Sequence, residues 1–156
     1  MIADVLVVGA GPVGLLTAYR LRSLGLSCLV LDQRLEPSRA SRASTFQPAT
    51  LDRLANLDLL SQLLPQGHQV GLLRHLDLPS GQRRDLDFAC LQAHSQHPFR
   101  LHLEQHWFCA LLLQRLDQLQ SSGEPAVCWG QKLVALGENP DPDRREPIEA
   151  WVLAPA

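Results

Sequence analysis

The feature that most constrains the fold is the hexapeptide GAGPVG, Gly9 to Gly14, which directly follows the apolar run VLVV. That run is short, continuous and rich in β-branched residues, which predicts a parallel strand covered on both faces. After the glycines, apolar residues recur at every third position from 15 to 24, so residues 12–24 are predicted to form an amphipathic helix that stops at Gly25. A second apolar run, 27–31, ends at Asp32, whose carboxylate can accept hydrogen bonds from a ribose. Strand, glycine turn, helix, strand and carboxylate together predict a Rossmann-like nucleotide site.

Each glycine of the turn has its own physical role. The first permits a tight turn, the second lets the backbone approach a pyrophosphate, and the third lets helix and strand pack closely. The phosphates would lie on the unpaired N–H groups and the positive dipole of the helix start. The predicted cofactor-binding residues of the turn are Gly9, Gly11, Pro12, Val13 and Gly14. The alternative is a glycine-rich turn that holds no ligand.

Size and charge limit the classes of function. A chain of 156 residues forms at most one domain, and a formal charge of −2 gives no reason to expect nucleic acid as a partner. No apolar stretch approaches the ~18 residues of a membrane span. The four cysteines show no C-x-x-C or metal spacing, which indicates reduced thiols in a cytoplasmic protein. The histidines between positions 94 and 106 lack a convincing set of co-ligands, so no metal site is expected.

The rest of the chain predicts further helices and additional β-strands. Residues 33–47 are polar and rich in arginine, which indicates a long functional loop. Helices are expected from Pro48 and over 59–64, and the best helix of this half over 105–121. The expected strands flank a turn at 79–81 and cover 99–103, 126–137 and 148–154, with a turn at 139–145 before the last.

Three blocks of the sequence resemble a known family. The first, ADVLVVGAGPVGLLTAYRLRSLGLSCLVLDQR, resembles the N-terminus of the FAD-dependent aromatic-ring hydroxylases. These are the single-component flavoprotein monooxygenases typified by p-hydroxybenzoate hydroxylase. RASRASTFQPATLDRLANLDLLSQLL looks like the family's arginine followed by a proline-led helix, and FRLHLEQHWFCALLLQRLDQL is similar to its strand and glutamine-led helix.

The resemblance implies an FAD site, with NADPH or NADH as the reductant. In that site the three glycines bind the pyrophosphate, and Asp32, usually glutamate in the family, holds the adenosine ribose. Arg34 lies beside the adenosine, Arg42 contacts the phosphates through its permanently charged fork, and Gln105 reaches the ribityl chain. One helical turn after this glutamine, Cys109 stands where the family commonly has a glutamate. No catalytic residue is assigned.

The family pattern continues past the C-terminal residues of this sequence. It goes on to an Asp-Gly motif, a Gly-Asp motif and a substrate-binding sheet domain. We therefore expect residues 1–156 to be the N-terminal part of an α/β FAD-binding domain, incomplete relative to the full fold and without these later motifs. The chain would bind FAD as part of an FAD- and NAD(P)H-dependent monooxygenase of aromatic or related small molecules, incomplete for catalysis by itself.

Other interpretations of the sequence stay open. One is the NAD(P)-binding Rossmann domain of a dehydrogenase. Another is a non-catalytic nucleotide-binding module completed by a second chain. Self-association is also compatible with either, because an unpaired strand edge favours association.

Overall fold

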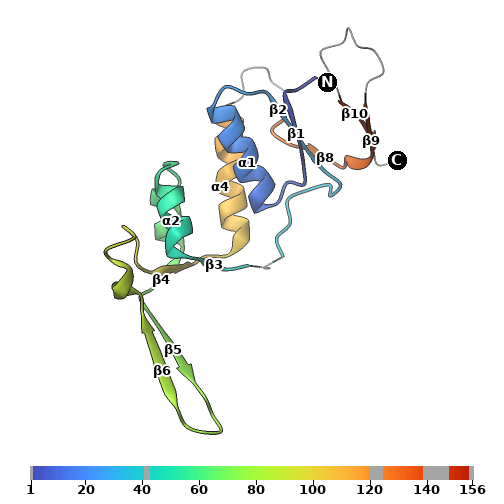
Figure 1. The fold of residues 1–156 in the computed structure, drawn as a ribbon. Helices are drawn as coiled ribbons and strands as arrows, with labels where there is room; N and C mark the ends of the chain where they lie inside the picture. The colour runs from blue at the N-terminus through green and yellow to red at the C-terminus, as the bar shows by residue number, and fades with distance from the viewer. Residues whose placement is uncertain (1, 41–42, 120–124, 139–147, 155–156) are drawn as a thin grey trace. The chain divides into compact units, whose positions relative to one another are not determined.

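The computed structural model describes residues 2–40, 43–119, 125–138 and 148–154 (Figure 1). Its helices and strands in chain order are β1 (Val5–Val8), α1 (Pro12–Ser23), β2 (Cys28–Asp32), β3 (Thr45–Phe46), α2 (Pro48–Ala55), α3 (Leu60–Leu63), β4 (His68–Val70), β5 (Leu72–Leu76), β6 (Arg83–Asp87), β7 (Arg100–His102), α4 (Gln105–Gln118), β8 (Cys128–Trp129), β9 (Lys132–Glu138) and β10 (Ile148–Leu153). Short 3₁₀ turns cover Leu64–Gln66 and Phe88–Leu91.

The chain divides into two compact units. Unit 1 comprises Met1–Ala40 and Cys109–Ala156, and unit 2 comprises Ser41–Phe108. Unit 2 is inserted in the chain between β2 and β8, the strand that completes the parallel sheet of unit 1. That the chain is the N-terminal part of one domain stays a prediction.

Unit 1 contains a parallel sheet with the strand order β1-β2-β8. β1 and β2 run parallel in the register Val5↔Cys28 to Val8↔Leu31, and β8 pairs with the end of β2 at Leu31↔Cys128. β2 is the more buried strand because it has a partner on both sides. The prediction that β1 is covered on both faces is wrong for the described residues: β1 lies at an edge of this sheet and its residues are half-buried or exposed.

Helix α1 follows the predicted pattern closely. Pro12 occupies its first turn, where the missing N–H costs nothing. Leu15 and Ala18 are fully buried, and Gly25, with φ of +83°, lies just beyond the helix end, as predicted. Leu24 was expected on the buried face but is 59% exposed, because it caps the helix after the last turn.

The later part of unit 1 differs in one respect from the expectation. Helix α4, which begins in unit 2 and continues into unit 1, forms where predicted, with Phe108, Leu112 and Leu116 buried. The single strand expected over 126–137 is two strands, β8 and β9, because Gly130 turns the chain between them with φ of +71°. β9 pairs antiparallel with β10. The turn expected at 139–145 lies outside the described residues.

Unit 2 has its own small core. The antiparallel sheet has the strand order β3-β7-β4, helices α2 and α3 contact each other, and the ring of Phe46 meets that of Phe108 edge to face at 5.3 Å between centroids. β5 and β6 form the predicted hairpin, whose turn contains Gly81 with φ of +65°. The loop expected over 33–47 contains β3. Among the helices that the structure describes, none is long and apolar enough to cross a membrane.

Candidate functional site

The glycine turn lies at the carboxyl ends of β1 and β2, where open parallel sheets bind their ligands. Gly9 has φ of +102°, which favours glycine, and its N–H donates to the Leu31 carbonyl oxygen at 2.7 Å. A Cβ on Gly14 would overlap the Gly9 carbonyl oxygen. The turn therefore needs glycine at both positions to join strand and helix this closely.

The middle of the turn is open. Gly11 is the N-cap of α1, and a Cβ placed on it would meet no atom within 4 Å. No side chain caps this helix end within the described chain, and the amides of Gly11, Val13 and Gly14 precede the first i→i−4 hydrogen bond, which runs from Leu15 N to Gly11 O. Unpaired amides at a helix N-terminus form a binding site for an anion.

Asp32, the last residue of β2, binds the glycine turn through a hydrogen bond from the Ala10 amide. Its carboxylate is only 5% exposed. Oδ2 accepts hydrogen bonds from Ala10 N at 2.7 Å and Arg34 Nη2 at 2.6 Å, and Oδ1 accepts from Arg34 N at 2.8 Å and Arg34 Nε at 2.9 Å. The Arg34 side-chain hydrogen bonds, opposed by burial and supported by the two backbone amides, lower the pKa of Asp32 to about 2. The carboxylate is thus ionised at any physiological pH.

Two residues of the β8–β9 turn fix the backbone around this carboxylate. Gly130 N donates to Arg34 O at 2.7 Å, and Gln131 N donates to Asp32 O at 2.9 Å. Sequence reasoning missed this support, as it missed the Ala10 amide. The glycine inside a strand-like run at 126–137 was the available signal, because an isolated glycine there indicates a bend or a close backbone approach.

The structure brings together part of the predicted site. The glycine turn, Asp32 and Arg34 all lie in unit 1 and are connected by hydrogen bonds. Gln105 is the first residue of α4 and belongs to unit 2. Arg42 lies outside the described residues. The roles of Gln105 and Arg42 stay predictions.

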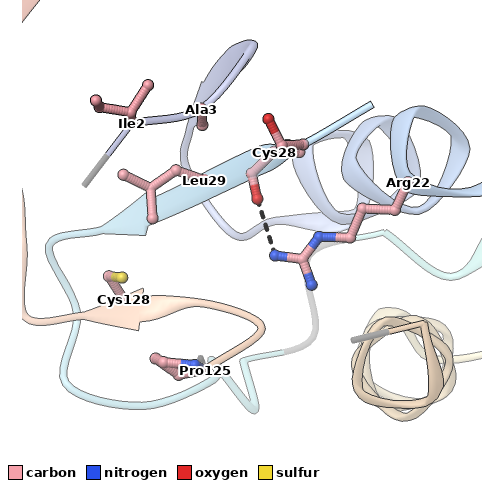
Figure 2. Close-up of a pocket in the computed structure, with 8 residues that line it drawn as sticks. Ile2, Ala3, Arg22, Cys28, Leu29, Pro125 and Cys128 are labelled. Atoms are coloured by element: carbon pink, nitrogen blue, oxygen red, sulfur yellow. Dashed lines mark hydrogen bonds between the residues drawn. The ribbon is translucent and has the colours of Figure 1, made fainter. Parts of the chain in front are cut away.

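A separate hollow in unit 1 lies at the other end of the sheet (Figure 2). It is lined by residues that precede or begin the strands, among them Ala3 and Cys28, so it lies at the amino ends of β1 and β2. Figure 2 shows Arg22 reaching from α1, where Nη2 donates to the Cys28 carbonyl oxygen at 2.8 Å. This hollow is not part of the glycine site.

Metal-ligating side chains do not gather in the part of the chain that the structure describes: no group of three or more His, Cys, Asp or Glu could hold an ion. His97 instead pairs with Asp52, with Nδ1 2.8 Å from Oδ1. None of the four cysteines forms a disulfide in the described structure, and burial raises the pKa of Cys28.

The uncapped N-terminus of α1, with open space at Gly11, can accept the phosphates of a nucleotide, and a family comparison identifies the nucleotide. The family model described as "FAD binding domain" matches residues 2–141. The chain belongs to this family. FAD is therefore the cofactor of the domain, and the predicted Rossmann-like α/β fold is confirmed. The alternative of a dehydrogenase's NAD(P)-binding domain is not supported.

Relatives of this FAD-binding domain are aromatic hydroxylases and related monooxygenases, as the resemblance implied. The rifampicin monooxygenase of Streptomyces venezuelae is 42% identical over 69 residues, covering 44% of this chain and 14% of that protein. The para-nitrophenol 4-monooxygenase of Pseudomonas sp. strain WBC-3 is 30% identical over 135 residues, covering 86% of this chain and 33% of that protein.

Solved structures give the same answer. The crystal structure of p-nitrophenol 4-monooxygenase from Pseudomonas putida DLL-E4 superposes with a TM-score of 0.78 at 28% identity, covering 90% of this chain and 35% of that one. The FAD-binding domain thus spans about a third or less of the length of these relatives.

Proposed function

We propose that this domain holds the ADP half of FAD on the glycine turn, with the pyrophosphate on the first-turn amides of α1. The observation that carries the proposal is the open position at Gly11 beside an uncapped helix N-terminus. Pro12 sets the backbone of the first turn, and Val13, which is 77% exposed, leaves its amide accessible. Gly9 and Gly14 shape the turn, and Asp32 holds the adenosine ribose.

Three further residues belong to the same proposal. The Arg34 side chain pairs with the carboxylate of Asp32, the proposed ribose acceptor, which supports a place for Arg34 beside the adenosine. Arg42 would contact the phosphates, since a guanidinium matches phosphate geometry and stays charged. Gln105 would reach the ribityl chain from the start of α4.

The wider activity is that of a monooxygenase acting on an aromatic or related small molecule, with NADPH or NADH as the reductant. This proposal is supported by the sequence similarity to the para-nitrophenol and rifampicin monooxygenases. When bound, FAD supplies electron transfer and oxygen activation, and the domain's own residues bind and orient it. The cysteines show no disulfide among the described residues, which fits a reducing compartment, so we place the protein in the cytoplasm. Self-association through an exposed strand edge stays a prediction.

The test compares Gly11→Val with wild type in reconstitution with FAD. A valine at this N-cap keeps an allowed φ, near −83°, but fills the space that the pyrophosphate needs. Loss of about two charge-assisted hydrogen bonds predicts a roughly 100-fold weaker Kd for FAD. Flavin fluorescence titration measures the Kd, and circular dichroism checks that the fold is kept.

Gly71→Val is the matched control, because Gly71 also has open space at its Cβ but lies in unit 2 between β4 and β5. The control should bind FAD as wild type does. Unchanged FAD binding by Gly11→Val would remove the glycine turn from the site. If the protein retained NAD and not FAD on desalting, the proposal that the glycine turn binds FAD would be wrong.

A further inference from the structure

The carboxylate of Asp32 has no free acceptor position in this structure. An ionised carboxylate offers about four lone-pair sites. Two are filled by backbone amides, from Ala10 and Arg34, and two by the Arg34 side chain through Nε and Nη2. A ribose hydroxyl can donate to Asp32 only after one of these donors has left.

The four donors differ in how easily they can leave. The Ala10 amide is part of the glycine turn, and the Arg34 amide is held because Gly130 N donates to the Arg34 carbonyl. The Arg34 side chain is 40% exposed and can rotate into solvent without breaking backbone structure. Of the four donors, its guanidinium is therefore the one that can leave most easily.

We propose that the Arg34 guanidinium occupies the ribose position of Asp32 and must be displaced when the adenosine of FAD binds. Arg34 is thus a gate residue that competes with the cofactor, and the ribose hydroxyls replace its two side-chain hydrogen bonds. This inference rests on the proposed function, because it takes Asp32 as the ribose acceptor. Since Asp32 stays ionised at neutral pH, the competition operates throughout the physiological range.

The competition has a consequence that can be measured with two nucleotides. ADP carries the ribose hydroxyls, whereas 2′,3′-dideoxy-ADP has the same phosphates and base without them. Removing the competitor with Arg34→Met should tighten ADP binding about fivefold, the value of one partly exposed ion pair. Binding of the dideoxy analogue should stay unchanged, because it never needs the carboxylate.

Arg20→Met is the matched control for charge. Arg20 is exposed on α1 of the same unit, so this variant removes one positive charge without touching Asp32. Losing this charge should weaken the binding of ADP and of the dideoxy analogue equally and slightly, because both carry the same phosphates. Arg34→Lys should fall between wild type and Arg34→Met for ADP, because an ammonium makes one hydrogen bond where the fork makes two.

A wild-type measurement avoids any dependence on the variants. The Arg34 Nε–Hε resonance, assigned by its loss in Arg34→Met, should shift and exchange faster with solvent when ADP is added. The dideoxy analogue should leave it in place. Calorimetric titration of wild type and the three variants gives the affinities. These affinities and the NMR spectrum support the gate if both change as predicted.

The results that overturn the gate are equally definite. If Arg34→Met weakens both nucleotides, Arg34 is a direct contact of the bound cofactor. If Arg34→Met leaves the ADP affinity unchanged and added ADP leaves the Nε–Hε resonance in place, the ribose does not displace Arg34 from Asp32. Failure of wild-type protein to bind FAD at all would instead refute the proposed function.

Discussion

Two regions of this molecule pair an aspartate with arginine, and they do so in different ways. In unit 1, Asp32 is 5% exposed and joins Arg34 at the end of the buried strand β2. On the β5–β6 hairpin of unit 2, Asp85 is 28% exposed and joins Arg74 and Arg83, which are 50% and 56% exposed. Both carboxylates have a lowered pKa, and in both the arginine side chains are the largest cause.

The difference lies in the backbone. Asp32 accepts two main-chain amides, one from the glycine turn and one from Arg34, so it fixes the shape of a turn. The hydrogen bonds described at Asp85 come from the side chains of Arg74 and Arg83. An exposed ion pair contributes little, because water and salt screen it. An arginine–aspartate pair therefore marks a site only where burial and backbone donors accompany it.

The largest single loss of stability should come from the glycine beside one of the two clusters. Gly14→Ala places a Cβ on the Gly9 carbonyl oxygen and should destabilise the protein by about 3 kcal/mol, the upper range for overpacking. Gly81→Ala meets open space and only the left-handed backbone conformation opposes it, so its cost should be about 1 kcal/mol. Urea unfolding of both variants measures the difference. Equal losses would mean that the glycine turn is no more tightly packed than a hairpin turn.

Local pattern was sufficient to predict the first unit's nucleotide-binding segment. The apolar run before Gly9, the proline-led helix and the carboxylate after β2 each have a local cause, so strand, turn, helix and Asp32 were placed correctly. The same holds for the helix from Pro48 and the hairpin around Gly81.

The sequence could not show interactions set by distant backbone. Nothing near Asp32 in sequence indicates that Gly130 and Gln131 hold its carbonyl and that of Arg34. The sequence pattern predicts a loop where the two-residue strand β3 forms, because so short a strand depends on pairing with β7 rather than on its own propensity. The hydrogen bonds from the Arg34 side chain to Asp32 likewise depend on a side-chain conformation that no residue pattern specifies.

The next contrast compares the two aspartates directly. Asp32→Ala removes the acceptor of a buried amide at Ala10 and the partner of Arg34, so it should lower the free energy of unfolding by about 2–3 kcal/mol. Asp85→Ala leaves only exposed guanidinium groups without a partner, and its stability should match wild type within error. Chemical denaturation at neutral pH measures both. A hairpin variant as unstable as the Asp32 variant would show that exposure does not separate the clusters.

The smallest contrast is in acid. The pKa of Asp32 is about 2 in the folded protein against an ordinary value of 3.8, so its ionised form is favoured by folding. That stabilisation is complete above pH ~4 and is lost as the pH falls toward ~2, and a shift of this size corresponds to about 2 kcal/mol. Wild type should therefore exceed Asp32→Asn in stability at pH 6 and converge with it near pH 2. In high salt the Asp32 gap should remain, because that carboxylate is buried, whereas Asp85→Asn should match wild type within error with and without salt, because exposed charges are screened. Urea unfolding from pH 6 down to about 2, with and without added salt, gives both curves. A gap at Asp32 that salt removes would place this carboxylate in solvent, like that of Asp85, and would leave the glycine turn without its buried support.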